Sequence, residues 1–321
     1  MRVTNRVMIN NYLHNLSRNQ QAMGKLQMQL STGHKVSRPS DDPFVVTRTM
    51  ELKSSIAANE RYKQNIEEAR GWTDTQEMAL GQMNDVLHKV RELTVQASND
   101  GALSDADKKA ISTQLQQLKE QLVEIGNTSY DGRYVFSGQK TTEKPFEIFN
   151  DPTNAANPNN GKVVYKGSNA GLDKELAPGV SLDIGIAGSE LFKDKYTSNT
   201  PNPPTPPNPF VDNVGIFSTI DELINSIENG GDTSSLLGKL DDNIENITTI
   251  RGASGARQNR LEDMHAKNES ETFNMTTLLS KTYDIDVAEK YMEAKVMESV
   301  FQASLNVGAM VMQPSILDFL R

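Results

Sequence analysis

Apolar residues recur at helical spacing through both ends of the chain, and this repeat limits what the sequence can fold into. Near the start the repeat comprises Ile9, Leu13, Leu16, Met23, Leu26 and Leu30. Near the end it comprises Tyr283, Ile285, Val287, Tyr291, Ala294, Met297, Phe301, Leu305, Met310 and Met312, and residues 316–321 continue it. Chain ends are usually polar and frayed. Two amphipathic ends therefore predict helices that pair with each other and with neighbouring copies.

A heptad pattern predicts a long helix from Pro43 to about Asn99, with Asp42 as its N-cap. The seam consists of Ile66, Ala69, Thr73, Gln76, Leu80, Met83, Leu87, Val90, Thr94 and Ala97. Because its polar members weaken the seam, we expect it to pack against helices of the same chain and not to form a long dimer zipper.

Further helices are expected on both sides of a β-rich middle. The earlier ones cover residues 7–31, ending at Gly33, and a segment that starts at Ser104 and runs past Ile125. The later ones start at Ile216, near Ser234 and at Asp286. Short β-branched and aromatic runs predict strands; these are residues 134–138, 146–149, 163–166 and 180–186. Residues 199–209 hold six of the 13 prolines and are expected to form an extended linker or loop.

The expected fold is mainly α with a β-rich insertion. The N- and C-terminal segments form a long helical bundle or coiled coil, and a small β domain lies at its tip. We expect an N-terminal assembly helix over 1–42 and the first part of a helical rod over 43–138. The inserted β-rich domain covers 139–215, the second part of the rod 216–284, and a C-terminal assembly helix 285–321.

Composition and motifs exclude several functions. The net charge is −9, from 33 basic and 42 acidic residues, which argues against nucleic acid as a partner. No apolar run approaches the length of a membrane helix, and no cleavable signal is recognisable, so no membrane insertion is expected. The absence of Cys excludes disulfides and thiol chemistry.

No catalytic or cofactor site is predicted either. The four histidines share no metal-ligand spacing, and neither a nucleophile elbow nor a phosphate-binding loop is present. We therefore expect no enzyme, no metal and no cofactor. Arg251, Arg257 and Arg260 lie where the apolar pattern lapses. They indicate either a solvated helix face or polar contacts to a neighbouring subunit.

Both ends carry motifs that resemble those of bacterial flagellins. Residues 26–30 form a leucine-containing helix end that leads into Ser31, Gly33, Arg38, Asp41 and Asp42, which match the N-terminal flagellin signature. Residues 286–289, 301–305 and 316–321 resemble the flagellin C-terminal helix. The resemblance covers about residues 1–140 and 235–321, with both motifs at the expected ends.

Two departures from filament flagellins narrow the resemblance. Pro43-Phe44 stands where filament flagellins usually have small residues, and the motif at 132–138 is typical of the superfamily members that join hook to filament. The short middle insertion also fits those members.

The resemblance implies a structural subunit that leaves the cell unfolded through the flagellar type III apparatus and becomes part of the extracellular flagellum. Its implied partners are further copies in a ring or tube, the first hook-associated protein, flagellin and a cytoplasmic export chaperone. A filament flagellin is the alternative within the family. A cytoplasmic coiled-coil scaffold, favoured by the 66–97 seam, is the alternative from another class, and export of the chain distinguishes the two.

The terminal stripes are the predicted assembly interface. One stripe comprises Leu13, Leu16, Met23, Leu26 and Leu30, and the other comprises Tyr291, Ala294, Phe301, Leu305 and Met312. The simplest arrangement packs the two stripes together and leaves further apolar surface for the next subunit. In an isolated monomer we expect residues 1 to about 40 and 285–321 to be disordered, because one amphipathic helix cannot offset its own ordering entropy.

Overall fold

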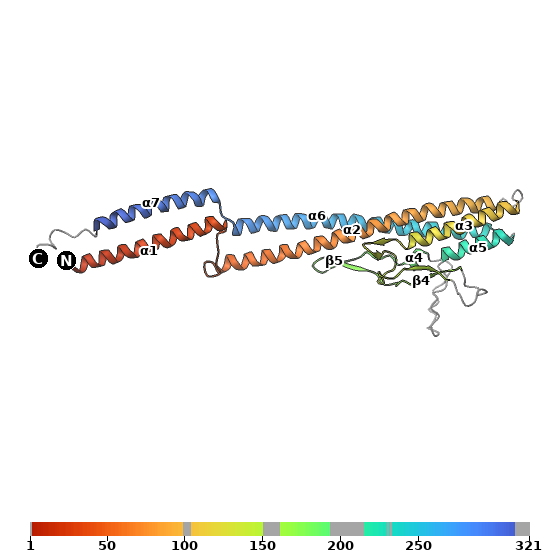
Figure 1. The fold of residues 1–321 in the computed structure, drawn as a ribbon, viewed down its shortest axis with the longest axis horizontal. Coiled ribbons are helices and arrows are strands. Elements are labelled where there is room, and N and C mark those ends of the chain that lie inside the picture. The colour runs from red at the N-terminus through yellow and green to blue at the C-terminus, as the bar shows by residue number, and fades with distance from the viewer. Residues whose placement is uncertain are drawn as a thin grey trace, which may run out of the picture. The chain divides into compact units, whose positions relative to one another are not determined.

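The computed structural model describes residues 2–98, 104–149, 161–192, 215–229, 231 and 233–311. Its helices are α1 (Arg2–Thr32), α2 (Pro43–Ser98), α3 (Asp105–Gly126), α4 (Gly188–Leu191), α5 (Gly215–Asn229), α6 (Ser234–Tyr283) and α7 (Val287–Val311) (Figure 1). Its strands are β1 (Ser129–Tyr130), β2 (Arg133–Tyr134), β3 (Phe146–Ile148), β4 (Val163–Tyr165), β5 (Asp173–Ala177) and β6 (Val180–Asp183). The expected proline-rich loop, the turn at 99–101 and the final segment 316–321 lie outside the described residues.

The chain forms two compact units. The first contains Met1–Glu60 and Glu269–Arg321, and the second contains Arg61–Asn268. The helices α2 and α6 contribute residues to both. The mainly α fold class with a small strand-containing region is confirmed.

The core of the second unit is built on the predicted seam of α2. Every residue of that seam, from Ile66 to Ala97, is buried. Its polar members are hydrogen-bonded, which removes most of the cost of burying them. Thr73 Oγ1 donates to Ala69 O at 2.7 Å, Thr94 Oγ1 donates to Val90 O at 2.7 Å, and Gln76 Nε2 donates to Val135 O at 3.1 Å. The seam therefore packs within the chain, as predicted.

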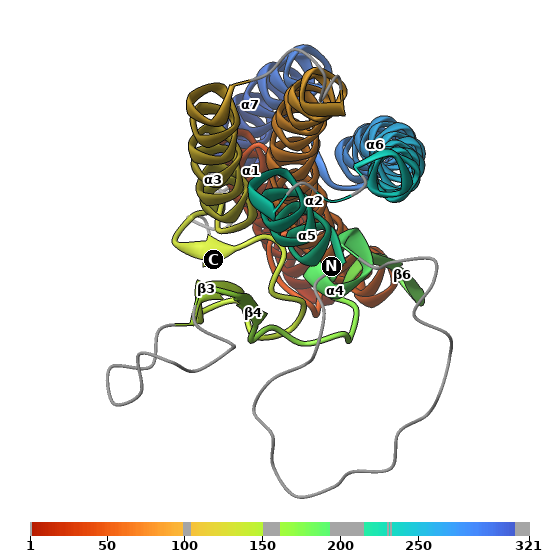
Figure 2. The same cartoon turned by 90° about the vertical axis from the view of Figure 1, so that its right-hand side faces the viewer.

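Buried residues of α3 and α5 join this seam in one hydrophobic cluster, and Figure 2 shows these two helices beside α2. Ser104 caps α3 as predicted: its side chain accepts from Asp107 N, and the Asp107 carboxylate accepts from Ser104 N. The Ser104 hydroxyl also donates to Asp107 Oδ2 at 2.6 Å, and this bond, together with the bond from Ser104 N, lowers the pKa of Asp107. The buried face of α5 comprises Ile216, Phe217, Ile220, Leu223 and Ile227.

Polar pairs join α2 to α6 along the second unit. Arg91 Nε lies 2.6 Å from Asp241 Oδ1, and Arg251 Nε lies 2.6 Å from Glu77 Oε1. Arg257 Nη1 donates to Gly185 O at 3.4 Å, in the strand region. Arg251 and Arg257 thus make polar contacts within the chain. The sequence had indicated either a solvated helix face or contacts to a neighbouring subunit, so neither expectation included these contacts.

The strands form antiparallel pairs, β1 with β2, β3 with β4, and β5 with β6. The expected strand at 134–138 is shorter than predicted: only Tyr134 belongs to β2, and among the buried residues after it Ser137 forms a single antiparallel bridge with Ala187. The strands β1 and β5 were not predicted, because neither has the β-branched or aromatic run that was sought. An aromatic cluster of Phe146, Phe192 and Phe217 joins the strands to α5, with ring centroids 5.0–6.1 Å apart.

The strand region lies against the side of α2, which corrects the expected position at the tip. Asn65 Nδ2 donates to Glu175 O at 2.9 Å, and Lys174 Nζ lies 2.6 Å from Glu68 Oε2. At Gly71 an added Cβ would come within 2.3 Å of the Tyr130 hydroxyl, so glycine lets the β1–β2 hairpin approach the helix. Tertiary contacts, which the hydropathy pattern does not report, set this position.

Candidate assembly interface

The first unit has very little core of its own. Among its described residues, the only hydrophobic side chains that are buried are Val36 and Leu52. Long helices gain most of their stability from packing an apolar face and not from intrinsic propensity. Because so few of its apolar side chains are buried, the first unit presents an exposed apolar surface that a partner chain can cover.

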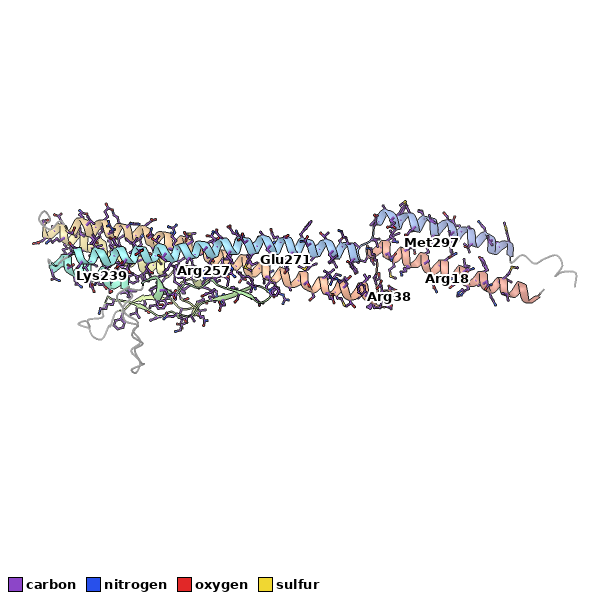
Figure 3. All side chains as sticks on the ribbon, turned by 180° about the vertical axis from the view of Figure 1, so that it is seen from behind. Arg18, Arg38, Lys239, Arg257, Glu271 and Met297 are labelled. Carbon is purple, nitrogen blue, oxygen red and sulfur yellow. The ribbon has the colours of Figure 1, made fainter. Side chains whose placement is uncertain are left out.

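Within this unit α1 and α7 lie side by side (Figure 1). The facing residues recur at alternating steps of three and four on each helix. On α1 they are Ile9, Tyr12, Leu16, Asn19, Met23, Leu26 and Leu30; on α7 they are Lys290, Ala294, Met297, Phe301, Ser304 and Gly308. Apart from Gly308, which is buried, these residues are only half-buried. Figure 3 marks Met297 on α7 and Arg18 on α1.

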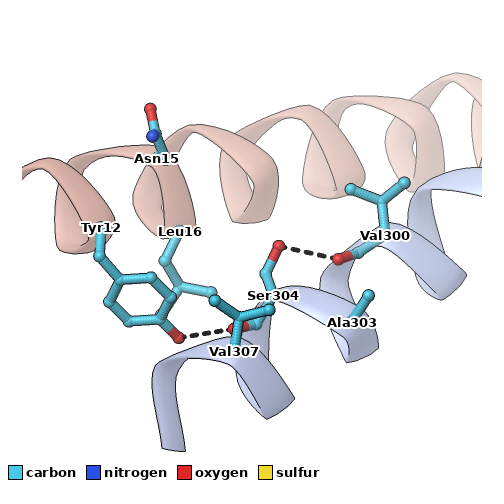
Figure 4. Close-up of a pocket in the computed structure, with 7 residues that line it drawn as sticks. All are labelled: Tyr12, Asn15, Leu16, Val300, Ala303, Ser304 and Val307. Carbon is cyan, nitrogen blue, oxygen red and sulfur yellow. Dashed lines mark hydrogen bonds between the residues drawn. The ribbon is translucent and has the colours of Figure 1, made fainter. Parts of the chain in front are cut away.

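Polar contacts fix the register of this helix pair. Tyr12 Oη donates to Ser304 O at 3.0 Å (Figure 4), and Asn19 Nδ2 donates to Ser304 Oγ at 3.2 Å. Beside them, an added Cβ on Gly308 would come within 2.0 Å of the Tyr12 hydroxyl. Glycine at position 308 thus makes room for the tyrosine ring, and the two hydrogen bonds specify which turns of the helices meet.

Charges on α7 pair within the helix. Lys290 Nζ lies 2.6 Å from Glu293 Oε2, and Lys295 Nζ lies 2.9 Å from Glu298 Oε2. The hydrogen bond to Glu293 raises the pKa of Lys290, and the bond to Glu298 raises the pKa of Lys295. Because Lys290 stands in the facing seam, this pairing allows a charged residue to remain next to apolar neighbours.

A short antiparallel bridge ties the segment after α1 to the segment after α6. Lys35 N donates to Tyr283 O at 2.7 Å, and Ile285 N donates to Gly33 O at 3.0 Å. The His34 ring stacks on the Tyr283 ring with centroids 4.0 Å apart, and His34 Nδ1 lies 3.2 Å from Asp284 Oδ1. Both terminal helices therefore begin or end at one common joint.

The signature residues build the turn between α1 and α2. Gly33 adopts a φ of +76°, and its N–H closes α1 on Gln29 O at 2.8 Å. Asp41 accepts from Arg38 N at 3.2 Å, and Asp42 Oδ1 accepts from Phe44 N and Val45 N, both at 3.1 Å. The Asp42 cap and the start of α2 at Pro43 are confirmed. Ser31 Oγ donates to Met28 O at 3.1 Å, so these residues act as caps and turns.

The structure divides the predicted interface residues between two surfaces. Those half-buried between α1 and α7 are Leu16, Met23, Leu26, Leu30, Ala294 and Phe301. Leu13, Tyr291 and Leu305 are exposed by 50%, 57% and 46%. Met312 lies outside the described residues. The sequence reasoning missed Tyr12, Asn19, Ser304 and Gly308, because it sought apolar side chains; an uninterrupted heptad count would have found them.

Among the described residues, no group of three His, Cys, Asp or Glu side chains is placed to hold a metal ion. None of the described helices combines the length and apolar character that crossing a membrane requires. The site offers exposed apolar helix surface, which suits association between chains.

Comparison with known proteins finds similarity to subunits of the bacterial flagellum. Residues 3–141 match the model of the bacterial flagellin N-terminal helical region. Hook-associated protein 3 of Escherichia coli is 26% identical over 317 residues, covering 95% of each chain. Flagellin of Bacillus subtilis is 26% identical over 305 residues, covering 95% of this chain and 94% of the relative. The crystal structure of hook-associated protein 3 from Legionella pneumophila superposes with a TM-score of 0.59 at 18% identity, over 72% of this chain and 98% of that one.

The chain carries the N-terminal helical region of bacterial flagellins over residues 3–141, and it resembles the flagellin superfamily along nearly its whole length. Within that superfamily it resembles the hook-associated proteins 3, in sequence along nearly its whole length and in fold.

Proposed function

We propose that this chain is a structural subunit of the bacterial flagellum that acts at the hook–filament junction and polymerises through its terminal helices. The observation that carries the proposal is the first unit, in which long helices retain exposed apolar residues and almost no core. In the second unit the same kind of seam is fully buried. The contrast supports a role in folding for the second unit and a role in association for the first.

The proposed role is structural and not catalytic. The subunit leaves the cell through the flagellar type III apparatus, and a cytoplasmic chaperone covers its terminal helices beforehand. Outside the cell it forms a ring or tube that contacts the first hook-associated protein on one side and flagellin on the other. Support comes from the likeness to hook-associated protein 3 and from the amphipathic character of both ends.

A deletion strain tests the junction role. Cells that lack this chain are expected to build hooks and to release flagellin monomers into the medium, because the filament has nothing to grow on. Returning the wild-type gene should restore attached filaments. Full filaments that stay attached in the deletion strain would contradict the junction assignment.

A filament flagellin is the second candidate, and the 26% identity to the Bacillus subtilis flagellin favours it. The same strain separates the two. If this chain were the filament subunit, its deletion would remove the main flagellin from the medium, and hook-associated proteins would remain on the hook.

A further inference from the structure

A second apolar stripe on α7 has no partner within the described chain. It consists of Met292, Val296, Val300, Ala303 and Val307, and it lies beside the face that packs on α1. Met292, Val296, Val300 and Val307 are exposed by 63%, 64%, 43% and 54%. A surface helix normally shows one apolar stripe. An adjoining second stripe indicates a helix built to contact two neighbours, of which the chain supplies one.

The stripe borders a groove and not a flat face. Two cavities that share Val300, of about 320 and 520 Å³, follow one side of the helix pair. Tyr12 and Leu16 of α1 line the first (Figure 4), and Leu26 lines the second. We call this feature the outer groove. Grooves of this kind accept the apolar face of an amphipathic helix.

The charged residues at the outer groove indicate which segment fills it. Glu289 and Glu293 line the end of the outer groove nearest the joint; Lys290 pairs with Glu293 at 2.6 Å, so these three residues leave this end with one net negative charge. The sequence of α1 has no acidic residue and carries Arg18 and Lys25, which are both exposed. A helix that is purely basic complements a groove with an acidic end.

The outward face of α1 has the dimensions to fill the groove. It presents Leu13, Ser17, Gln20, Gly24 and Met28, which are all exposed and uncharged. Leu13 and Met28 are 15 residues apart, as are Met292 and Val307 on the groove, so both pairs span about four helical turns.

Gly24 gives an independent indication of close approach. A Cβ added at Gly24 would meet no atom of the described residues within 4 Å, so no contact that the structure describes requires glycine there. Glycine in an exposed helix interior costs stability relative to alanine. A neighbouring helix that packs closely on this face would explain the glycine. It would also explain the small side chain of Ser17, one heptad earlier.

We infer that the outer groove of one copy receives the outward face of α1 from a second copy, in a head-to-tail contact that repeats around a ring or tube. This inference rests on the proposed self-assembly and names the surfaces that meet. The contact is heterologous, because the groove and the outward face of α1 are different surfaces of the same chain.

Cross-linking of the full-length chain tests the inference, since the absence of native Cys makes each introduced thiol unambiguous. A Val300→Cys chain is mixed in turn with Leu13→Cys, Gln20→Cys and Met28→Cys chains under conditions where wild-type chains associate. A mixed disulfide dimer is expected with at least one partner. Leu305→Cys is the matched control: Leu305 has a similar exposed fraction but lies on the opposite side of α7, so it should give roughly tenfold less of the same dimer.

Substitutions at Gly24 provide a second readout. Gly24→Leu should reduce the mixed dimer about tenfold by blocking close approach, while Gly24→Ala should not reduce it. Val300→Cys dimers that form only with themselves would overturn the choice of α1 as occupant. So would a Val300 thiol that becomes reactive in the monomer only after removal of residues 312–321, since the chain's own end would then cover the groove.

Sedimentation of the wild-type chain separates the two levels of the proposal. If wild-type chains do not associate at any concentration, the proposed self-assembly fails. If they associate and the cross-links do not connect Val300 with α1, only the assignment of surfaces fails.

Discussion

A buried ion pair allows a sharp test of how the second unit is held together. Lys119 lies on α3 and is only 2% exposed, and its Nζ is 2.5 Å from Asp221 Oδ1 on α5 and 2.7 Å from Gly161 O. The carboxylate is more accessible, with 28% of the Asp221 side chain exposed. The two partners therefore differ in how easily water can replace a lost contact.

This asymmetry predicts unequal effects of removing either partner. Asp221→Asn leaves an uncompensated ammonium in the interior, which costs about 3–5 kcal/mol. Lys119→Met removes the buried charge itself and leaves a carboxylate that can be hydrated or protonated. Burial already raises the pKa of Asp221 against the opposing effect of Lys119. We expect Lys119→Met to cost about 1 kcal/mol or less, since apolar replacement of buried pairs is often neutral.

Thermal unfolding at pH 7, followed by circular dichroism, measures the difference. For a unit of this size each kcal/mol lowers the melting temperature by roughly 2–4 °C, so Asp221→Asn should lower it by about 6–20 °C. The double variant Lys119→Met/Asp221→Leu should unfold within a few degrees of wild type. Equal losses in Asp221→Asn and Lys119→Met would refute the reasoning, because they would mean that the pair's attraction, and not the stranded charge, decides stability.

Three other outcomes are expected. Limited proteolysis of the monomer should trim both ends and leave a core near residues 45–280; equal protection of ends and core would contradict the assignment of folding to the second unit. Leu26→Asp or Leu305→Asp should abolish incorporation into flagella while the circular dichroism of the monomer is retained. Deletion of residues 200–208 should leave incorporation intact. Filament-attachment assays that give the reverse pattern would mean that the terminal helices are not the assembly surface. Burial raises the pKa of the Tyr165 hydroxyl to about 12, so the stability that this group contributes is complete below its ordinary pKa of 10 and is lost as pH rises through 12. In alkaline denaturation, Tyr165→Phe should therefore make this loss of stability smaller. An unchanged loss would exclude Tyr165 as its cause.

The sequence alone determined the helices and much of the core. The heptad seam from Ile66 to Ala97 is buried at every position, because a repeat of this length can be satisfied only by one continuous helix face. The starts of α2, α3 and α7 were equally readable, since Asp42, Ser104 and Asp286 are local caps whose hydrogen bonds involve only the next few residues. The flagellin signature could be recognised because its residues form a turn that depends on the same local chemistry.

Only the tertiary structure decided which stripes face each other and where the strands lie. Leu13 and Leu305 satisfy the helical period as well as Leu16 and Phe301 do, yet the first two are exposed and the last two are half-buried. The choice depends on Tyr12, Asn19 and Gly308, whose contacts to the other helix set the rotation of the pair. The strands rest against the side of α2 because Gly71 admits the Tyr130 ring, a contact between residues far apart in the chain. Periodicity along one helix defines its apolar faces, but the shape of the partner selects which of them is covered.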